Sequence, residues 1–142
     1  MQEPTGNIIA GKLSKSHPFD AGQDVYSNEN KMIHPLDSAI IHTGLFLEVP
    51  KGYVGLLWSR SGLSCNDKIE VGAGCIDYGY KGEVLVHLYN LGINSFQVTK
   101  GMKITQLLTI PVLTSPYKQV GGWSESIETL RGEAGIGSTG NF

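Results

Sequence analysis

Short apolar or alternating runs, separated by turn residues, occupy the middle of the chain. The runs that favour strands are residues 39–41, 45–49, 53–58, 83–89, 96–98 and 104–112. Turn-forming sequences such as Pro50-Lys51-Gly52 and Lys100-Gly101 lie between them, at a spacing typical of a β-sandwich or barrel. No helix-length periodic segment separates the runs, which argues against parallel βαβ units. The pattern therefore predicts an all-β fold with at most one short helix, near residues 65–68.

The character of the chain changes after Pro116, where Gly121-Gly122 is followed by a Gly-rich, polar segment. This segment has few apolar residues whose burial could offset the entropy of ordering it. We therefore expect a β domain over residues 1–116 and a flexible C-terminal arm over residues 117–142. The arm should become ordered only on a ligand or a neighbouring subunit, as part of the same domain in an assembly.

A chain of 142 residues has the size of one ordinary domain, and its 11 basic and 13 acidic residues give a formal charge of −2. This balance predicts no general attraction to nucleic acid or to an anionic membrane, so any phosphate site must be local. The chain shows neither a secretory pattern nor an apolar run of about 18 residues. We expect a cytoplasmic protein, in the host cell if the source is viral, with the nucleus as an alternative.

The two cysteines, Cys65 and Cys75, and the four histidines follow no metal-ligand spacing. We expect the cysteines to be reduced, semi-buried thiols and the histidines to be structural or surface residues. The sequence thus predicts no metal cage made of side chains. The 19 glycines instead indicate many tight turns, in agreement with an all-β architecture.

Three segments carry residue types that suit a phosphorylated ligand. Residues 131–140 combine Arg131 with glycines and two hydroxyls, which suits wrapping a polyphosphate with backbone N–H donors. Residues 59–64 supply an arginine, hydroxyls and a glycine that can approach an anion closely. Residues 72–83 form a hairpin-like run with Asp77 and Tyr80 three residues apart. Taken singly, the segments are as typical of a flexible terminus, a surface turn and a backbone-capping aspartate.

Together with two further segments, they resemble the five ordered motifs of the trimeric dUTPase family. The motifs are residues 20–27, 60–64, 74–82, 101–107 and 131–140, and the resemblance covers residues 18–140. It implies a jelly-roll-like, distorted β-barrel that forms a homotrimer, with the tail of one subunit closing over the site of another. It also implies a dUTP diphosphatase that converts dUTP to dUMP and pyrophosphate, keeping uracil out of DNA and supplying dUMP for dTMP synthesis.

The resemblance assigns roles to individual residues. Asp77 would be the general base for water attack on the α-phosphorus, because a carboxylate is ionised and available at neutral pH. Tyr80 would stack on the deoxyribose and exclude a 2′-hydroxyl. The uracil would lie against three residues of the hairpin: Gly74, Cys75 and Leu85. The remaining substrate contacts would come from four residues of the body and five of the closed tail: Arg60, Ser61, Gly62 and Gln106, and Arg131, Ile136, Gly137, Ser138 and Thr139.

Magnesium is the cofactor that the resemblance implies. It would be held mainly by the substrate phosphates, with Asp24 and Gln106 reaching it through water, because magnesium keeps several waters in such sites. For each of these two residues a purely structural role, as a turn cap or a cross-strand partner, is the alternative.

The chain departs from the family pattern at several positions. Ile136 stands where the tail motif commonly has an aromatic residue that stacks on uracil, and stacking contributes about 1–3 kcal/mol per base. Glu133-Ala134 replaces a Gly pair, Ser59 replaces a proline, and Lys81 replaces an arginine, keeping the charge without the planar fork. We expect weaker substrate capture or slower tail closure as a result.

Two other functions compete with this interpretation. A dCTP deaminase has the same fold but places a catalytic glutamate where this chain has His87, so deamination is disfavoured. The second is a binding or regulatory protein that keeps the fold with weak or no catalysis. Retention of Arg60, Ser61, Asp77 and Tyr80 favours catalysis.

Overall fold

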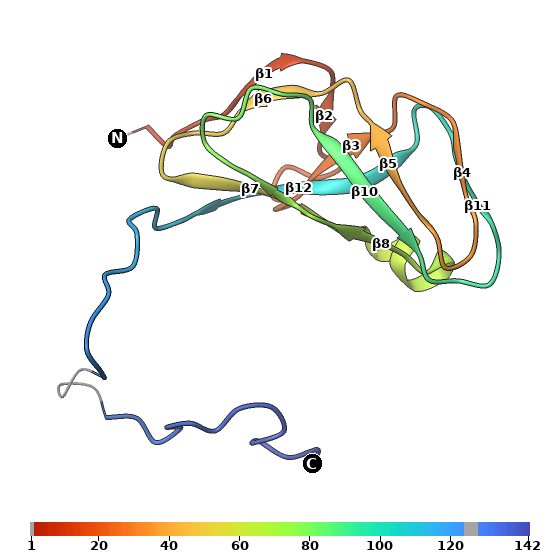
Figure 1. Cartoon of the computed structure of the whole chain (residues 1–142). Coiled ribbons are helices and arrows are strands. Elements are labelled where there is room, and N and C mark those ends of the chain that lie inside the picture. Colours follow the sequence, from red (N-terminus) through yellow and green to blue (C-terminus); the bar gives the residue numbers. More distant parts are fainter. Residues whose placement is uncertain (1, 124–127) are drawn as a thin grey trace.

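The computed structural model describes residues 2–123 and 128–142, and its ordered body is built almost entirely from strands (Figure 1). One five-residue helical segment, η1 (Leu63–Asp67), interrupts them, closed by a hydrogen bond from the Lys68 N–H to the Leu63 carbonyl. The strands are β1 (Asn7–Ala10), β2 (Leu13–Ser14), β3 (Gln23–Tyr26), β4 (Lys31–Ile33), β5 (Ser38–His42), β6 (Phe46–Glu48), β7 (Tyr53–Trp58), β8 (Ile69–Gly72), β9 (Cys75–Ile76), β10 (Leu85–Asn90), β11 (Phe96–Val98) and β12 (Lys103–Pro111).

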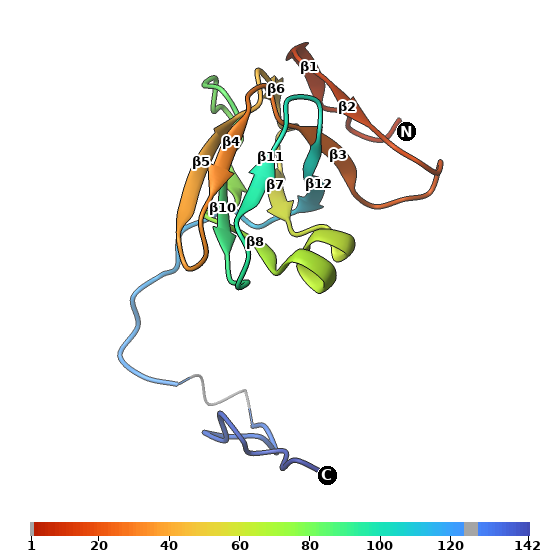
Figure 2. The ribbon, with the colours of Figure 1, turned by 90° about the vertical axis from the view of Figure 1, so that its right-hand side faces the viewer.

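The strands form four sheets in which every pair is antiparallel. The largest sheet has the order β2-β3-β12-β7-β9, and a three-stranded sheet has the order β5-β10-β8. Two smaller sheets pair β1 with β6 and β11 with β4. Figure 2 shows these sheets wrapped around one another. Among the described residues the sheets do not close into a single hydrogen-bonded barrel, so the fold is the distorted jelly roll that the sequence predicts.

Alternation along the strands places one side of each sheet in the core. In β10, Val86 and Leu88 are fully buried, whereas Leu85 before them and Tyr89 after them point outward and are exposed. The same strand ends at Asn90, which is also fully buried. Its Nδ2 donates to the Ile33 and Asn94 carbonyls at 2.9 and 2.8 Å, and its Oδ1 accepts from the Gly92 N–H at 2.9 Å. These bonds tie the end of β10 to the end of β4 and to the loop before β11, because a buried amide needs its partners.

All six predicted strand runs are strands in the structure; two have the predicted ends, and the ends of the other four shift by at most two residues. The short helix also lies where it is predicted, beginning at Leu63. Six strands were not predicted from the sequence: β1, β2, β3, β4, β8 and β9. The expectation of semi-buried cysteines is wrong, because Cys65 and Cys75 are both free and exposed. Cys65 lies on η1, and Cys75 lies on β9, an edge strand.

The chain leaves the sheets after β12, where the Val112 N–H donates to the Gly52 carbonyl at 3.0 Å. Both views show the following segment running away from the strands (Figures 1 and 2). The described residues from 113 onward are exposed, including the large side chains Tyr117, Trp123 and Phe142. The division into residues 1–116 and an arm of residues 117–142 stays a prediction. Within residues 2–123 and 128–142, no helix is long and apolar enough to cross a membrane.

Candidate functional site

A row of side chains across the largest sheet forms the base of the candidate site. In the register of this sheet, Gln106 on the central strand β12 faces Asp24 on β3 and Trp58 on β7. Directly opposed residues of paired strands project from the same face of a sheet, so these three side chains lie side by side. Val25 and Leu57, their neighbours in sequence, point into the core. Strand alternation thus brings residues from three distant parts of the chain to one outer surface.

Gln106 is fixed in this row by two contacts. Its Nε2 donates to the Ser59 carbonyl at 3.0 Å, just after the end of β7. On its other side the backbone of Gly22 passes so closely that a Cβ there would lie 3.0 Å from Cδ and 3.1 Å from Cβ of Gln106. Only a glycine allows this approach without moving the side chain. The glutamine is therefore held by its surroundings before any ligand binds.

Asp24 carries the main charge of the row and is engaged by two cations. Its Oδ2 lies 3.0 Å from Lys103 Nζ and its Oδ1 lies 3.3 Å from Arg60 Nε. The Asp24 side chain is 14% exposed, against 35% for Arg60 and 36% for Lys103. A second bond runs from Arg60 Nη1 to the Lys103 carbonyl at 3.4 Å. The carboxylate therefore holds the guanidinium in place while leaving part of it accessible to a ligand.

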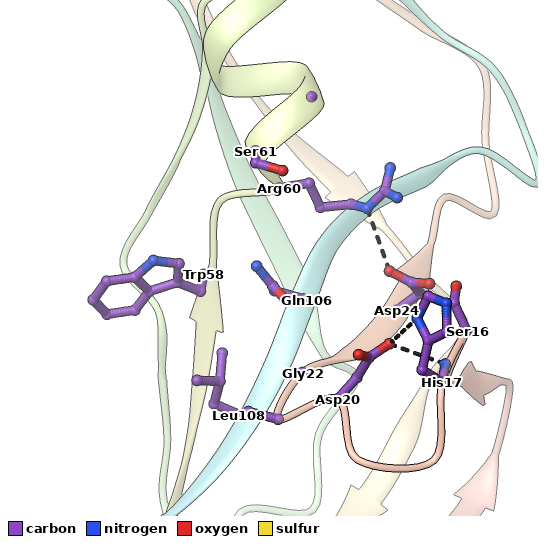
Figure 3. A pocket seen from close by; sticks show the side chains of 12 residues that line it. Ser16, His17, Asp20, Gly22, Asp24, Trp58, Arg60, Ser61, Gln106 and Leu108 are labelled. Atoms are coloured by element: carbon purple, nitrogen blue, oxygen red, sulfur yellow. Dashed lines mark hydrogen bonds and ion pairs between the residues drawn. The ribbon is translucent and has the colours of Figure 1, made fainter.

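A cavity of about 530 Å³ opens over this row. Figure 3 shows Arg60 and Ser61 on one side of it and Asp20, Gly22 and His17 on the other. Its full lining is Ser16, His17, Asp20, Ala21, Gly22, Asp24, Trp58, Arg60, Ser61, Gly62, Gln106 and Leu108. The volume lies in the range of small-molecule sites. A guanidinium, a hydroxyl and a glycine at one wall suit a ligand with phosphate groups.

The loop before β3 contributes cavity residues that sequence reasoning missed. His17 lines the cavity together with Asp20, and its Nδ1 lies 3.1 Å from Asp20 Oδ2. The same carboxylate oxygen accepts the His17 N–H at 3.0 Å. In the sequence the histidines are expected to be structural or surface residues, and nothing in their spacing signals a cavity. Asp20 stands at the start of the first motif, and that position was its only signal.

A second cavity, of about 630 Å³, shares Trp58, Ser61 and Gln106 with the first and lies toward η1 and β8. It contains Glu70, whose Oε2 accepts from Ser59 Oγ at 2.6 Å and whose Oε1 accepts from Ser64 Oγ. The hydrogen bonds from Ser59 and Ser64 hold the pKa of Glu70 below its usual value. The Val71 N–H also donates to Ser59 Oγ at 3.0 Å. These bonds fix both ends of the segment that carries Arg60 and Ser61.

The hairpin with the predicted uracil and sugar contacts lies on the edge of the same sheet. The Leu57 N–H donates to the Gly74 carbonyl at 2.8 Å, and a Cβ on Gly74 would lie 2.7 Å from the Leu57 carbonyl oxygen. Cys75 pairs with Leu56 beside it. Asp77, Tyr80 and Leu85 are exposed. None of these three side chains lines either cavity. Within one chain, the exposed Asp77 carboxylate and Tyr80 ring therefore lie outside the cavity that contains Arg60.

The tail motif is exposed along its length and is stabilised only locally in the described residues. Arg131 Nε donates to the Ala134 carbonyl at 2.9 Å, and the Ala134 N–H donates back to the Arg131 carbonyl at 3.0 Å. A second turn has the Ser138 N–H on the Gly135 carbonyl at 3.1 Å. Ile136, Gly137 and Thr139 are likewise exposed. The structure therefore brings together the residues of the first, second and fourth motifs, and leaves the third and fifth elsewhere.

The described residues, 2–123 and 128–142, contain no group of three or more histidine, cysteine, aspartate or glutamate side chains able to hold a metal ion. The two residues expected near magnesium, Asp24 and Gln106, do lie together in the first cavity. Carboxylate and amide oxygens are ligands that suit a hard cation. Asp24 and Gln106 alone could not complete a coordination sphere, so such an ion would need oxygens from a ligand or from water.

Comparison with known proteins agrees with the motif pattern. The dUTPase family model matches residues 10–140. A deoxyuridine 5′-triphosphate nucleotidohydrolase of Clostridium novyi is 41% identical over 128 residues, which cover 89% of this chain and 88% of the relative. The fowlpox virus protein of the same name is 40% identical over 143 residues, covering 99% of both chains.

Solved structures give the same result. A mutant dUTPase of Staphylococcus bacteriophage 80alpha, in a structure with dUpNHpp, has a TM-score of 0.88 and 30% identity, covering 96% of this chain and 99% of that one. A mutant dUTPase of phage phi11 of S. aureus, described with a structural Mg(II) ion, has a TM-score of 0.78 and 29% identity, covering 84% and 98%. Family model, sequence relatives and structures agree over nearly the whole length, and the chain belongs to the dUTPase family.

Proposed function

We propose that the chain hydrolyses dUTP to dUMP and pyrophosphate by water attack on the α-phosphorus, with Asp77 as the general base. The observation that carries this proposal is the cavity in which Arg60, Ser61 and Gly62 stand over the Asp24–Gln106 row. These residues would form the phosphate half of the active site, the part that binds the triphosphate of the substrate. Phosphoryl transfer depends mainly on positioning and charge stabilisation, for which a held guanidinium and backbone N–H groups are suited.

In this proposal the phosphate half stabilises the leaving group. Arg60 donates charge-assisted hydrogen bonds to the phosphates, and the Ser61 hydroxyl lies near the bridging oxygen on which charge develops. The Gly62 N–H adds a backbone donor. Support comes from the fixed position of Arg60, which Asp24 and the Lys103 carbonyl hold from two sides. Donors from the tail complete the pyrophosphate contacts: Arg131, Gly137, Ser138 and Thr139.

The nucleoside half of the site, the part that binds the base and the sugar, is the hairpin that contains β9 and the loop after it. The backbone around Gly74 and Cys75, with Leu85, takes the uracil, and a cytosine is rejected because its mismatched polar groups would stay unpaired. Tyr80 excludes ribose by occupying the space of the 2′-hydroxyl. Asp77 accepts a hydrogen bond from the sugar 3′-hydroxyl and a proton from the attacking water. The exposure of Asp77 supports this, since a base must reach its ligand.

Magnesium fits the donor set as a cofactor bound mainly through substrate phosphates. When bound, it would neutralise charge on the phosphate oxygens. Asp24 and Gln106 would reach it through water, and Asp24 would then share its carboxylate between the ion and the two cations that it already contacts. The structural Mg(II) ion described for the phi11 dUTPase supports metal binding in the family.

A homotrimer with exchanged tails is the assembly that this proposal requires. Within one chain, Asp77 and Tyr80 do not line the cavity that contains Arg60, and the described tail residues form only local hydrogen bonds. A complete site would then combine the phosphate half of one subunit, the hairpin of a second and the tail of a third. The partners are dUTP and further copies of the chain, and we place the protein in the cytoplasm.

The proposal is tested by measuring pyrophosphate release from dUTP, dTTP, dCTP and UTP, with and without magnesium. The wild type should turn over dUTP with a far higher kcat/KM than the other three nucleotides. Asp77→Asn keeps the shape of the side chain and removes its basicity, so turnover should fall by about 10²- to 10⁴-fold while binding of dUTP persists. Turnover in the variant within tenfold of wild type would exclude Asp77 as the base.

A binding or regulatory role is the second candidate function. The dUTPase of phage 80alpha is described as controlling the transfer of virulence genes, which supports regulatory use of this fold. Ile136 and Glu133 in the exposed tail motif are the residues that would weaken catalysis. Retained dUTP binding with no turnover of any nucleotide would favour this function over catalysis.

A further inference from the structure

The loop between β9 and β10 carries Asp77 and Tyr80 but has few contacts of its own with the body. Its internal bonds are local: the Tyr80 N–H donates to the Asp77 carbonyl at 3.1 Å, and the Tyr80 hydroxyl donates to the Glu83 carbonyl at 2.8 Å. Gly82 lies under the ring, since a Cβ there would come within 2.6 Å of Tyr80 Cζ. These contacts shape the loop without attaching it to another element.

Glu83 supplies the attachment through its side chain. Its Oε1 accepts from the Gly44 N–H at 2.9 Å, and its Oε2 lies 2.9 Å from His42 Nδ1. The carboxylate therefore spans from the end of the loop to the connection between β5 and β6. The backbone continues the contact, because the Val84 N–H donates to the Leu45 carbonyl at 2.8 Å. The Glu83 side chain is 24% exposed and the His42 side chain is 56% exposed, so the bond to Gly44 is partly shielded from water and the bond to His42 lies at the surface.

The receiving end of this contact is shaped by a glycine turn and by further hydrogen bonds. Gly44 has a φ of +64°, a left-handed conformation that favours glycine, and this conformation turns its N–H toward the carboxylate. The Thr43 hydroxyl beside it donates to the Val84 carbonyl and accepts the Leu45 N–H at 3.0 Å. A charged acceptor on a fixed backbone donor makes a stronger hydrogen bond than a neutral pair does.

We propose that Glu83, held between Gly44 and His42, is a positioning residue that fixes the Asp77–Gly82 loop and thereby sets how strongly the site prefers deoxyribose over ribose. The inference rests on the proposed roles of Asp77 and Tyr80. The Tyr80 ring can exclude ribose only if it is held in place, because a ring that shifts makes room for the 2′-hydroxyl. In this proposal Glu83 acts through the loop and does not itself contact the substrate.

The charges around His42 make the contact depend on pH. Glu83 faces it from the loop, while Glu29 and Lys31 face it from the segment before β5; the Glu29 carboxylate also accepts the His42 N–H at 3.3 Å. The hydrogen bond and charge of Glu83 raise the pKa of His42 above 6.5, and the His42 hydrogen bond lowers the pKa of Glu83 below 4.5. Both side chains are therefore charged between pH 4.5 and pH 6.5, and the ion pair weakens as the pH rises through the raised pKa of His42.

Three variants separate positioning from general stability. Glu83→Ala removes both side-chain contacts, while Glu83→Gln keeps an acceptor for the Gly44 N–H and loses the charge. His42→Arg keeps a cation that does not titrate in this range. The matched control is Glu48→Ala, which removes another carboxylate of the body, one whose hydrogen bond is to the exposed Asn7 side chain at 3.0 Å.

The readout is kcat/KM for dUTP divided by kcat/KM for UTP, measured from pH 6 to pH 9. We expect this ratio to fall about tenfold in Glu83→Ala, equivalent to about 1.4 kcal/mol, and about threefold in Glu83→Gln. The control should stay within about twofold of wild type. In the wild type the ratio should decline as His42 loses its proton, and in His42→Arg it should stay level.

An unchanged ratio in both Glu83 variants would overturn the proposal, even if their melting temperatures fall. If Glu83→Ala does not fold, Glu83→Gln and the pH profile of His42→Arg provide the test. A dUTP/UTP ratio that declines with rising pH equally in wild type and in His42→Arg would also count against the proposal. Calorimetric binding of non-hydrolysable dUTP and UTP analogues gives the corresponding ratio of affinities, which should change in the same direction without turnover. Failure of Asp77 as the base would appear only in the kinetics, so the two proposals can fail separately.

Discussion

The contact of Asp24 with two cations predicts a measurable loss of stability in Asp24→Asn. The amide keeps the shape of the carboxylate, so packing is preserved and only charge is removed. The two ion pairs, at 3.0 and 3.3 Å, involve partners that are about one-third exposed. Pairs of this kind contribute about 0.5–1.5 kcal/mol each, so the unfolding free energy should fall by about 1–3 kcal/mol. For a domain of this size that is a drop in Tm of about 3–10 °C.

The assay is thermal unfolding followed by circular dichroism at low and at high salt. Because the lost interactions are charge pairs at a partly exposed site, the difference between wild type and variant should shrink at 1 M salt. Asp67→Asn is the matched control: Asp67 is exposed, and no ion pair joins it to another described residue. A Tm for Asp24→Asn equal to that of wild type at low salt would refute the reasoning.

Three further predictions follow from other contacts. Asn90→Ala removes the three hydrogen bonds of a fully buried amide side chain, so the unfolding free energy from urea titration should fall by about 2–4 kcal/mol; a loss below 1 kcal/mol would contradict this. Because the pKa of Glu70 is lowered in the folded protein, ionised Glu70 stabilises the fold above about pH 4.5, and this stabilisation is lost as the pH falls through the folded-state pKa. Glu70→Gln should therefore flatten the acid side of the curve of Tm against pH, and an unaltered curve would count against this prediction. Ile136→Phe adds a ring that can stack on uracil, so the KM for dUTP should fall up to about tenfold, and an unchanged KM would exclude the stacking argument.

The sequence predicts those strands whose apolar pattern is long enough to read. β7 and β12 contain six and nine residues with clear apolar runs, and both were predicted within two residues. β2 and β9 contain two residues each, too few to show a period of two. β3 contains one buried apolar residue, Val25, and exists because it pairs with the distant β12. Pairing partners far apart in the chain cannot be inferred from local pattern.

For the candidate site, too, the sequence predicts the local motifs but not the contacts that depend on the tertiary structure. The five motifs were visible in the sequence, and three of them do meet in one cavity. The contact of Asp24 with Lys103 was not predicted, because it depends on the register between β3 and β12. His17 was missed for a related reason: the loop before β3 carries it to the cavity, and no residue type in that loop indicates the destination.

The central claim is that dUTP hydrolysis takes place at a site made by more than one chain. The direct test mixes two inactive variants, Arg60→Ala and Asp77→Asn, refolds them together, and measures pyrophosphate release from dUTP. A shared site can take an intact Arg60 from one subunit and an intact Asp77 from another, so an equal mixture should recover about a quarter of wild-type activity. A mixture no more active than its parents, although differently tagged subunits copurify, would show that the two residues act within one chain and would contradict the account.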